Sequence, residues 1–511
     1  MITELFFEKI PRFFAALYRL LCESFIFGVA RKVWTAVKNA FMGCFAGRLL
    51  SERPDENTLS KDSLLFRVID GACVRIVGAF GRLIGVLTFG TCSFTGTRLL
   101  AKLRELYSFL DFEFVIGISL CAFILCPGDL WHNVYGLVIA LFLLGVELVL
   151  AATKKRGYVP LRTAGAAFFA FVLSTLVSVV IAGDRADALR VMIFFGTSFI
   201  MAIVVAVDVT DARKLKKILG FIYLAVIATA VYAFAQRALG VAANASLTDL
   251  KVNADMPGRV FSTFDNPNNY AELLVLTMPL CVAYCLMIER KGVRAIALFL
   301  ELLPFAAMLM TYSRSGWISL LLSALIFIFL YNKKLIPALI LAALIVIPLL
   351  PSSVLARIGT IGSTKDSSNH YRLYIWEGVM RMLGVDSNWF TGVGLGPASF
   401  RAVYLPNCVE AAAPAPHSHM LYLEIWIEQG IVGVISYFGM LFSAVRRSIL
   451  AMKFASREVR LALIAGVSAL GGIAFASAAE YIWFYPRVMV MYFVVLGVLY
   501  ACVNIARSKE N

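Results

Sequence analysis

The sequence predicts an all-α, polytopic integral membrane protein with about 12 transmembrane helices and a large extracytoplasmic loop that contains short helices. Hydrophobic residues make up 60% of the 511 residues, charged residues make up 15%, and the mean hydropathy is +0.83. Apolar runs of nearly membrane-spanning length recur from about residue 109 onward, separated by short charged segments. This composition is typical of a membrane protein rather than of several soluble domains.

A transmembrane helix needs about 20 predominantly apolar residues. The runs after residue 108 predict twelve spans, at 109–126, 133–152, 161–182, 188–208, 216–235, 270–288, 294–312, 315–331, 335–350, 421–445, 459–478 and 487–505. Residues 109–511 are therefore predicted to form one membrane domain, with a large outer loop at about 351–420.

Residues 1–108 are predicted to form a cytoplasmic or membrane-surface helical extension. This region is hydrophobic but contains 15 Lys and Arg residues and nine acidic residues. Apolar residues at helical spacing around Arg12 and Arg19 favour a basic amphipathic helix that lies on the membrane. The longest uncharged run, 83–97, is too short to span a bilayer. We expect surface-lying helices divided by the polar segment 51–57, with insertion of 68–97 as the alternative.

Loop charge predicts the orientation, because Lys and Arg beside membrane spans tend to stay in the cytoplasm. Basic residues gather in every second loop, at 154–156, 213–217, 290–294, 333–334, 446–453 and 507–509, whereas the other loops are acidic or mixed in sign. Both termini are then cytoplasmic. The loops 236–269 and 351–420 lie outside, together with all four histidines.

The formal net charge of +15 suits cytoplasmic loops that face anionic lipid. No long basic block or RNA-binding motif accompanies it, so nucleic acid is not an expected partner. The ten cysteines show no metal-ligand spacing, and no further His or Cys cluster accompanies the His417-Ser418-His419 pair. We predict neither a metal site nor a cofactor.

Three arginines at the predicted outer face are candidates for binding an anion. Arg259 precedes the turn Asn266-Pro267-Asn268, where both asparagines can cap the next helix. Arg314 stands at a tight break between two spans. Arg372 lies on the predicted amphipathic helix 366–383. Each has a simpler explanation. Arg259 and Arg372 would be solvated side chains, and Arg314 would reach lipid headgroups.

Two further segments of the large loop attract attention. His417 and His419 end a Pro-rich stretch that leads into a span, which suggests a positioned base, although an interfacial histidine is usually structural. Gly392, Gly394 and Gly396 lack the spacing of a nucleotide-binding loop, and a flexible turn ahead of Phe400 is the better interpretation. Arg357 is a weaker candidate for the basic group.

These groups make chemical sense together. Several arginines that converge on one cleft can hold a pyrophosphate through charge-assisted hydrogen bonds without a divalent metal. Stabilising the negative charge on a diphosphate leaving group assists its transfer most. A neutral imidazole nearby can take the proton from a sugar hydroxyl, which contributes about 10²–10⁴ in rate. The expected chemistry is glycosyl transfer from a polyprenyl-diphosphate-linked sugar.

The ordered motifs of residues 110–505 resemble those of the bacterial O-antigen ligase and O-antigen polymerase superfamily. The segments that carry the resemblance are 261–271, 313–317, 392–394, 417–424 and 428–433, and they include Asp265-Asn266-Pro267-Asn268-Asn269, Ser313-Arg314-Ser315-Gly316-Trp317 and His417-Ser418-His419. No single motif is specific, but their order and the large loop before the last three spans both match. Residues 1–108 lie outside the resemblance.

The resemblance implies a metal-independent glycosyltransferase in the bacterial cytoplasmic (inner) membrane. Its substrate would be an undecaprenyl-diphosphate-linked oligosaccharide, and its partners would be membrane lipid and other polysaccharide-assembly proteins. Arg259 and Arg372, with Arg314, would bind the diphosphate. His419 or His417 would act as the base, and the family's Asn after the histidine is replaced here by Met420, which leaves the working histidine open. Supporting positions are Asn266, Asn268, Tyr422 and Glu424.

Two other functions remain open at this point. A transporter or flippase of lipid-linked glycan also commonly has twelve spans, but it should place ionisable groups at mid-bilayer, where Glu301 is the main acid. A non-catalytic scaffold for glycan assembly would be favoured if Arg259, Arg372 and His419 lay too far apart to reach one substrate.

Overall fold

The computed structural model describes residues 64–87, 111–152, 161–241, 258–359 and 367–508, together with the isolated positions 32, 35, 36 and 39. These residues form helices and no strands, in agreement with the predicted fold class. The predicted amphipathic helix around Arg12 and Arg19 and the polar segment 51–57 lie outside the described residues.

Nine helical stretches in the described ranges are long and apolar enough to cross a membrane. The helices at the predicted spans are α8 (Phe112–Leu125), α9 (Asn133–Ala152), α10 (Ala166–Ile181), α11 (Arg185–Asp208), α12 (Ala212–Ala238), α13 (Pro267–Met287), α14 (Lys291–Leu300), α15 (Leu302–Met310), α16 (Arg314–Asn332), α17 (Ile336–Val346), α22 (Leu421–Ala451), α23 (Arg457–Ser477) and α24 (Pro486–Arg507). The protein is thus a polytopic membrane protein.

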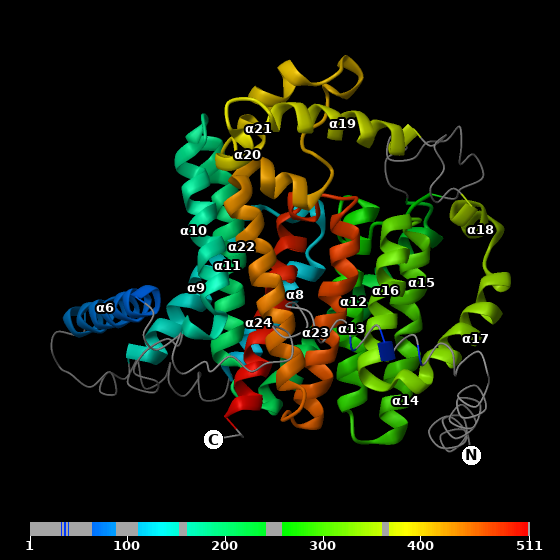
Figure 1. Cartoon of the computed structure of the whole chain (residues 1–511). Helices are drawn as coiled ribbons and strands as arrows, with labels where there is room; N and C mark the ends of the chain where they lie inside the picture. The colour runs from blue at the N-terminus through cyan, green and yellow to red at the C-terminus, as the bar shows by residue number, and fades with distance from the viewer. Residues whose placement is uncertain are drawn as a thin grey trace.

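The count of twelve spans stays a prediction. Helices α8 and α10, with 14 and 16 residues, are shorter than each of the nine stretches. The two spans predicted at 315–331 and 335–350 correspond to α16 and α17, which the 3-10 turn η5 (Lys333–Leu335) joins. Helix α17 leans away from the bundle in Figure 1 and buries none of its residues.

One end of the bundle is covered by the helices of the large predicted loop, and we call it the loop end (Figure 1). The elements there are α18 (Ser352–Gly359), α19 (Ser367–Leu383), α20 (Asn388–Thr391), α21 (Pro397–Tyr404), η7 (Leu405–Asn407) and η8 (Glu410–Ala412). As predicted for an amphipathic helix, α19 buries a stripe at Ile375 and Val379, against Phe400 and Tyr404 of α21. The face next to this stripe is left for polar contacts.

The starts of α8 and α12 meet at the other end of the bundle. Lys214 contacts Asp208 at 3.2 Å, and Lys217 forms an ion pair with Asp111. Two of these residues belong to a basic loop that the sequence assigns to the cytoplasm. Which end faces the cytoplasm stays a prediction that rests on the loop charges.

Helix α24 is the most enclosed of the nine stretches, with 94% of its apolar segment buried. The short 3-10 helix η9 (Ile482–Phe484) leads into it and is anchored by Trp483, whose ring packs against Phe171, Phe195 and Phe493 at centroid distances of 5.4 to 5.8 Å. Clustered aromatic rings are among the strongest packing anchors. The residues just before and after η9 are therefore held firmly at the loop end.

Helix α22 has a sharp kink at Gly430, whose backbone angles are φ 65° and ψ −169°. The kink admits the segment 390–396, because a Cβ at Gly430 would lie only 2.0 Å from the carbonyl oxygen of Phe390. The Val393 N–H donates to the Ile427 carbonyl at 2.7 Å. The turn at 392–396, predicted to be flexible, is instead packed tightly between α22 and α10.

One long helix of the N-terminal region is described, α6 (Leu64–Leu87), and it lies beside α9, across the direction of the bundle helices (Figure 1). Its Cys73 and Val77 form a small buried cluster with Ala151 and Val207. The helical extension predicted for residues 1–108 and its placement on a membrane surface stay predictions.

Candidate functional site

A polar cluster at the loop end is centred on Glu480. This residue lies between α23 and η9, and its carbonyl accepts a hydrogen bond of 3.2 Å from the N–H of Leu421, the first residue of α22. The turn is thereby tied to α22 on one side and to the aromatic anchor of Trp483 on the other. Its carboxylate consequently has a fixed position.

The Glu480 carboxylate contacts two of the predicted site residues. Arg372 Nη2 of α19 donates to Glu480 Oε1 at 2.5 Å, and Asn268 Nδ2 of α13 donates to the same oxygen at 3.3 Å. Burial alone would raise the pKa of Glu480, but the positive charge of Arg372 and contacts with the two histidines outweigh it, so this pKa lies below its usual value. Glu480 is thus an anion that orients a guanidinium.

Arg259 joins the same network through Asn268. Its Nη2 donates to Asn268 Oδ1 at 2.6 Å, and its Nε donates to the Thr311 carbonyl at 2.7 Å. Burial, followed by the charges of Arg357 and Arg314, lowers the pKa of Arg259 to about 10. The group is still charged at neutral pH, and it is close enough to two other guanidinium groups to be affected by their fields.

The two guanidinium groups near Arg259 belong to Arg314 and Arg357. Arg314 is the first residue of α16, directly after the Ser313 cap, whose side chain accepts from the Gly316 N–H. Arg357 belongs to α18, and its Nε donates to the Tyr312 carbonyl at 3.5 Å. Arg314 and Arg357 thus lie near enough to Arg259 for their charges to lower its pKa. Arg259 contacts Asn268 directly, and Arg372 contacts Glu480.

One prediction for the turn before α13 needs a correction. Asn266 is the N-cap of α13, since its Oδ1 accepts from the Asn268 N–H at 2.8 Å. Asn268 was expected to cap as well, but its side chain instead links Arg259 to Glu480. One capping oxygen already serves the turn, so the second amide is available for the cluster.

The His417-Ser418-His419 segment lies on the other side of Glu480. His419 Nδ1 is 3.9 Å from Glu480 Oε2, and the His419 backbone has a left-handed φ of 53°. This conformation folds the segment so that the His419 N–H donates to His417 Nδ1 at 3.1 Å, with the ring centroids 4.3 Å apart. Both histidines therefore lie at the cluster, but in different roles.

His417 is held as a neutral ring. Because its Nδ1 accepts a backbone hydrogen bond, the proton of the neutral ring is on Nε2. Burial and the neighbouring His419 lower the pKa of His417 to about 3. The lone pair that a base would use is thus occupied, whereas the described residues give His419 Nδ1 no hydrogen-bond partner closer than Glu480.

The backbone of Ser418 is fixed from two sides. Glu424 Oε2 of α22 accepts from the Ser418 N–H at 2.7 Å, and Trp376 Nε1 of α19 donates to the Ser418 carbonyl at 3.0 Å. Trp376 and Arg372 are four residues apart, so one face of α19 holds both the histidine segment and Glu480. Glu424 therefore acts by positioning the histidines.

The structure brings together Arg259, Arg372, Asn268, His417 and His419. Tyr422 lies apart from this network, because its hydroxyl donates to the Ala474 carbonyl at 2.5 Å and ties α22 to α23. No role was predicted for Glu480, although a lone acidic residue between the last two spans was a usable signal. Its partners lie 108 and 212 residues away in the chain, a relationship that no local pattern contains.

A comparison with protein families found a match within the predicted membrane domain. The family model described as O-Antigen ligase matches residues 299–438, a range that contains Arg314, Arg357, Arg372 and both histidines of the cluster. A search of curated proteins found no match. The family match confirms the resemblance to the O-antigen ligase and polymerase superfamily over residues 299–438.

Proposed function

We propose that this protein transfers a glycan from a polyprenyl diphosphate to an acceptor hydroxyl at the outer face of the bacterial cytoplasmic membrane. The observation that carries the proposal is the linked series Arg259, Asn268, Glu480 and Arg372, with His419 beside it. Guanidinium groups bind phosphate oxygens through paired, charge-assisted hydrogen bonds. The Nε of Arg372 is buried and has no partner among the described residues, so this N–H is available to donate to a bound anion.

In this mechanism the arginines bind the diphosphate, with Asn268 and Glu480 holding Arg259 and Arg372 in position. The acceptor oxygen attacks the anomeric carbon, and the bond from that carbon to the phosphate oxygen breaks. The polyprenyl diphosphate leaves with the electron pair, and the guanidinium groups stabilise its added charge. All of these steps use side chains of the cluster alone.

The proton of the acceptor hydroxyl passes to His419. With Nδ1–H directed at Glu480, the lone pair of the neutral ring lies on Nε2, which is the arrangement a general base requires. The separation of 3.9 Å has to shorten for a hydrogen bond, as catalytic contacts often do when substrate binds. His417 has its lone pair occupied and is assigned a positioning role.

The transporter alternative gains no support from these contacts, because the cluster lies at one end of the bundle rather than midway along it. The scaffold alternative required Arg259, Arg372 and His419 to be far apart. Hydrogen bonds through Asn268 and Glu480 instead link Arg259 to Arg372.

The experiment that tests the proposal uses the purified full-length protein in nanodiscs with a labelled undecaprenyl-diphosphate oligosaccharide and host-derived acceptor. Release of undecaprenyl diphosphate with formation of a longer or acceptor-attached glycan is expected, in the presence of EDTA as well as without it. Intact donor after long incubation would contradict the proposal. Deleting the protein in its host separates the two activities, because unpolymerised lipid-linked units indicate a polymerase and unattached long chains indicate a ligase.

A further inference from the structure

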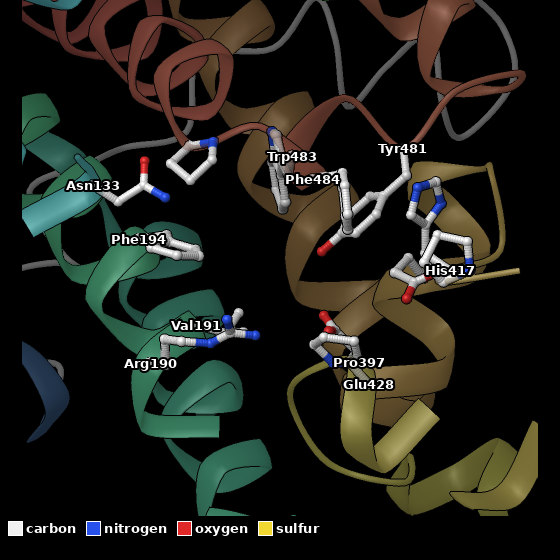
Figure 2. Close-up of a pocket in the computed structure, with 13 residues that line it drawn as sticks. Asn133, Arg190, Val191, Phe194, Pro397, His417, Glu428, Tyr481, Trp483 and Phe484 are labelled. Carbon is white, nitrogen blue, oxygen red and sulfur yellow. The ribbon is translucent and has the colours of Figure 1, made fainter. Parts of the chain in front are cut away.

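A cavity of about 200 Å³ lies beside His417, between α11, the start of α21, the first turns of α22 and η9 (Figure 2). This is smaller than the roughly 300–1,000 Å³ of pockets that enclose drug-sized ligands. It is a size for a single ring rather than for a lipid chain. None of the arginines of the cluster lines it.

Two buried carboxylates form one side of the cavity. Glu424 and Glu428 project from consecutive turns of α22, and both line it. Glu428 Oε1 accepts from the Gly396 N–H at 3.0 Å, which leaves Oε2 without a hydrogen bond from the described residues. Because this side chain lines the cavity, its second oxygen is available to accept a hydrogen bond from whatever fills it.

The opposite walls are aromatic. Phe194 of α11 lies on one side, and Trp483 and Phe484 of η9 lie on another (Figure 2). The hydroxyl of Tyr481 points into the cavity between them. Burial, and then the charges of Glu428 and Glu424, raise the pKa of Tyr481, so its hydroxyl stays protonated and available as a donor.

Aromatic faces next to carboxylates are the chemistry that recognises a sugar ring. The C–H face of a pyranose packs on an aromatic side chain, and its hydroxyls donate to carboxylate oxygens and accept from a phenol. The cavity also touches the site, since His417 lines it and its ring centroid is 4.3 Å from that of His419, with the two rings tilted. The His417 ring therefore separates a sugar in the cavity from the proposed base.

We infer that this cavity is a subsite for a sugar of the acceptor glycan next to the one that carries the reacting hydroxyl, an inference that rests on the proposed function. Its charge predicts the class of sugar. Glu424 and Glu428 face Arg190, which is itself paired with Asp187 at 2.7 Å. The cavity therefore favours a neutral or amino-bearing pyranose and disfavours a uronic acid, because two acidic side chains line it and Arg190, the cation on its wall, is already paired with Asp187.

The test measures saturation-transfer NMR binding of three soluble probes to the full-length protein in nanodiscs: methyl glucoside, methyl glucosaminide and methyl glucuronide. The first two should bind, and the glucuronide should bind more weakly. Tyr481→Phe and Glu428→Gln should each weaken binding about tenfold, the effect of losing one hydrogen bond to the ligand. Matched controls are Tyr232→Phe on α12 and Glu377→Gln on α19, both exposed and away from the cavity.

Absence of saturation transfer to all three probes would overturn the inference, and so would equal binding in wild type and both cavity variants. A preference for the glucuronide would overturn the predicted sugar class. Arg372→Ala distinguishes a failure of this inference from a failure of the proposed function, because the variant should lose donor binding and keep glycoside binding. Glycoside binding by a protein that never consumes the lipid-linked donor would contradict the transfer activity and leave the sugar subsite standing.

Discussion

Arg372 and Glu480 meet at 2.5 Å across 108 residues of sequence, and both side chains are largely shielded from solvent. A buried ion pair adds little net stability, because desolvation offsets most of the attraction, but removing one partner costs about 3–5 kcal/mol. Such a pair is best explained by the position it gives to a functional group. Here it fixes a guanidinium next to a histidine and leaves its Nε unsatisfied.

Glu480→Gln should lower glycan transfer by about 10² or more, while membrane insertion is unchanged. The amide keeps the size and one acceptor oxygen, but it loses the charge that holds Arg372 and orients His419. Transfer by purified variant and wild type in nanodiscs measures the effect. Glu377→Gln, which removes the exposed partner of Arg381 on the same helix as Arg372, serves as the control. Wild-type activity in Glu480→Gln would show that the carboxylate does not organise the site.

The two histidines should respond differently to the same substitution. His419→Asn should lose about 10²–10⁴ of the rate, because the base is gone. His417→Asn should stay within about tenfold of wild type, because the asparagine oxygen can accept the backbone N–H two residues on and preserve the turn. Single-turnover rates at saturating donor make the comparison. The reverse order of effects would make His417 the working histidine.

Arg259→Lys should reduce transfer at least tenfold. Arg259 uses Nε for Thr311 and Nη2 for Asn268, and an ammonium cannot make both contacts from one position and also meet a phosphate. Arg457→Lys offers a matched control, since Arg457, at the start of α23, is exposed and donates to the Leu286 carbonyl of α13. If Arg259→Lys has full activity, the forked geometry is unnecessary at this position.

Stability should fall in acid through His417. Its folded pKa of about 3 lies below the usual 6.5, so the unfolded chain binds the proton more readily than the folded protein. The folded state is therefore unaffected above about pH 6.5 and progressively loses stability as the pH falls from there toward 3. Glu480, whose pKa is also lowered, acts in the same direction below its usual value.

The melting temperature in detergent, measured from pH 8 to pH 4, checks this account. Wild type should lose stability below pH 6.5, and His417→Asn should lose less, because it has no buried imidazole to charge. An identical pH dependence in the two proteins would assign the acid sensitivity to other groups.

The sequence predicted the elements of this fold because their signals are local. Apolar runs of sufficient length mark the spans, and the amphipathic pattern of 366–383 predicted the helix α19 that carries Arg372. Asn266 could be identified as a cap because capping involves the next two residues. Features of this kind depend on period and neighbours, which a single sequence contains.

The remaining features depend on contacts between distant segments. The sequence predicted Asn268 as a second cap, because its hydrogen bond to Glu480, 212 residues away, has no local signal. The glycine turn at 392–396 seemed loose because the kink at Gly430 that receives it has no signature in the sequence. Glu428 resembled an ordinary acidic residue on a helix, and only the packing of α11 and η9 around it reveals a cavity.

The central claim is that the guanidinium cluster around Glu480 binds a lipid-linked diphosphate. Equilibrium binding of undecaprenyl diphosphate to wild type, Arg372→Ala and the control Arg381→Ala in nanodiscs is the most direct test, because Arg381 is an exposed arginine on the same helix. We predict binding to wild type and Arg381→Ala, and a Kd at least tenfold weaker for Arg372→Ala. The same Kd in all three proteins would contradict the account.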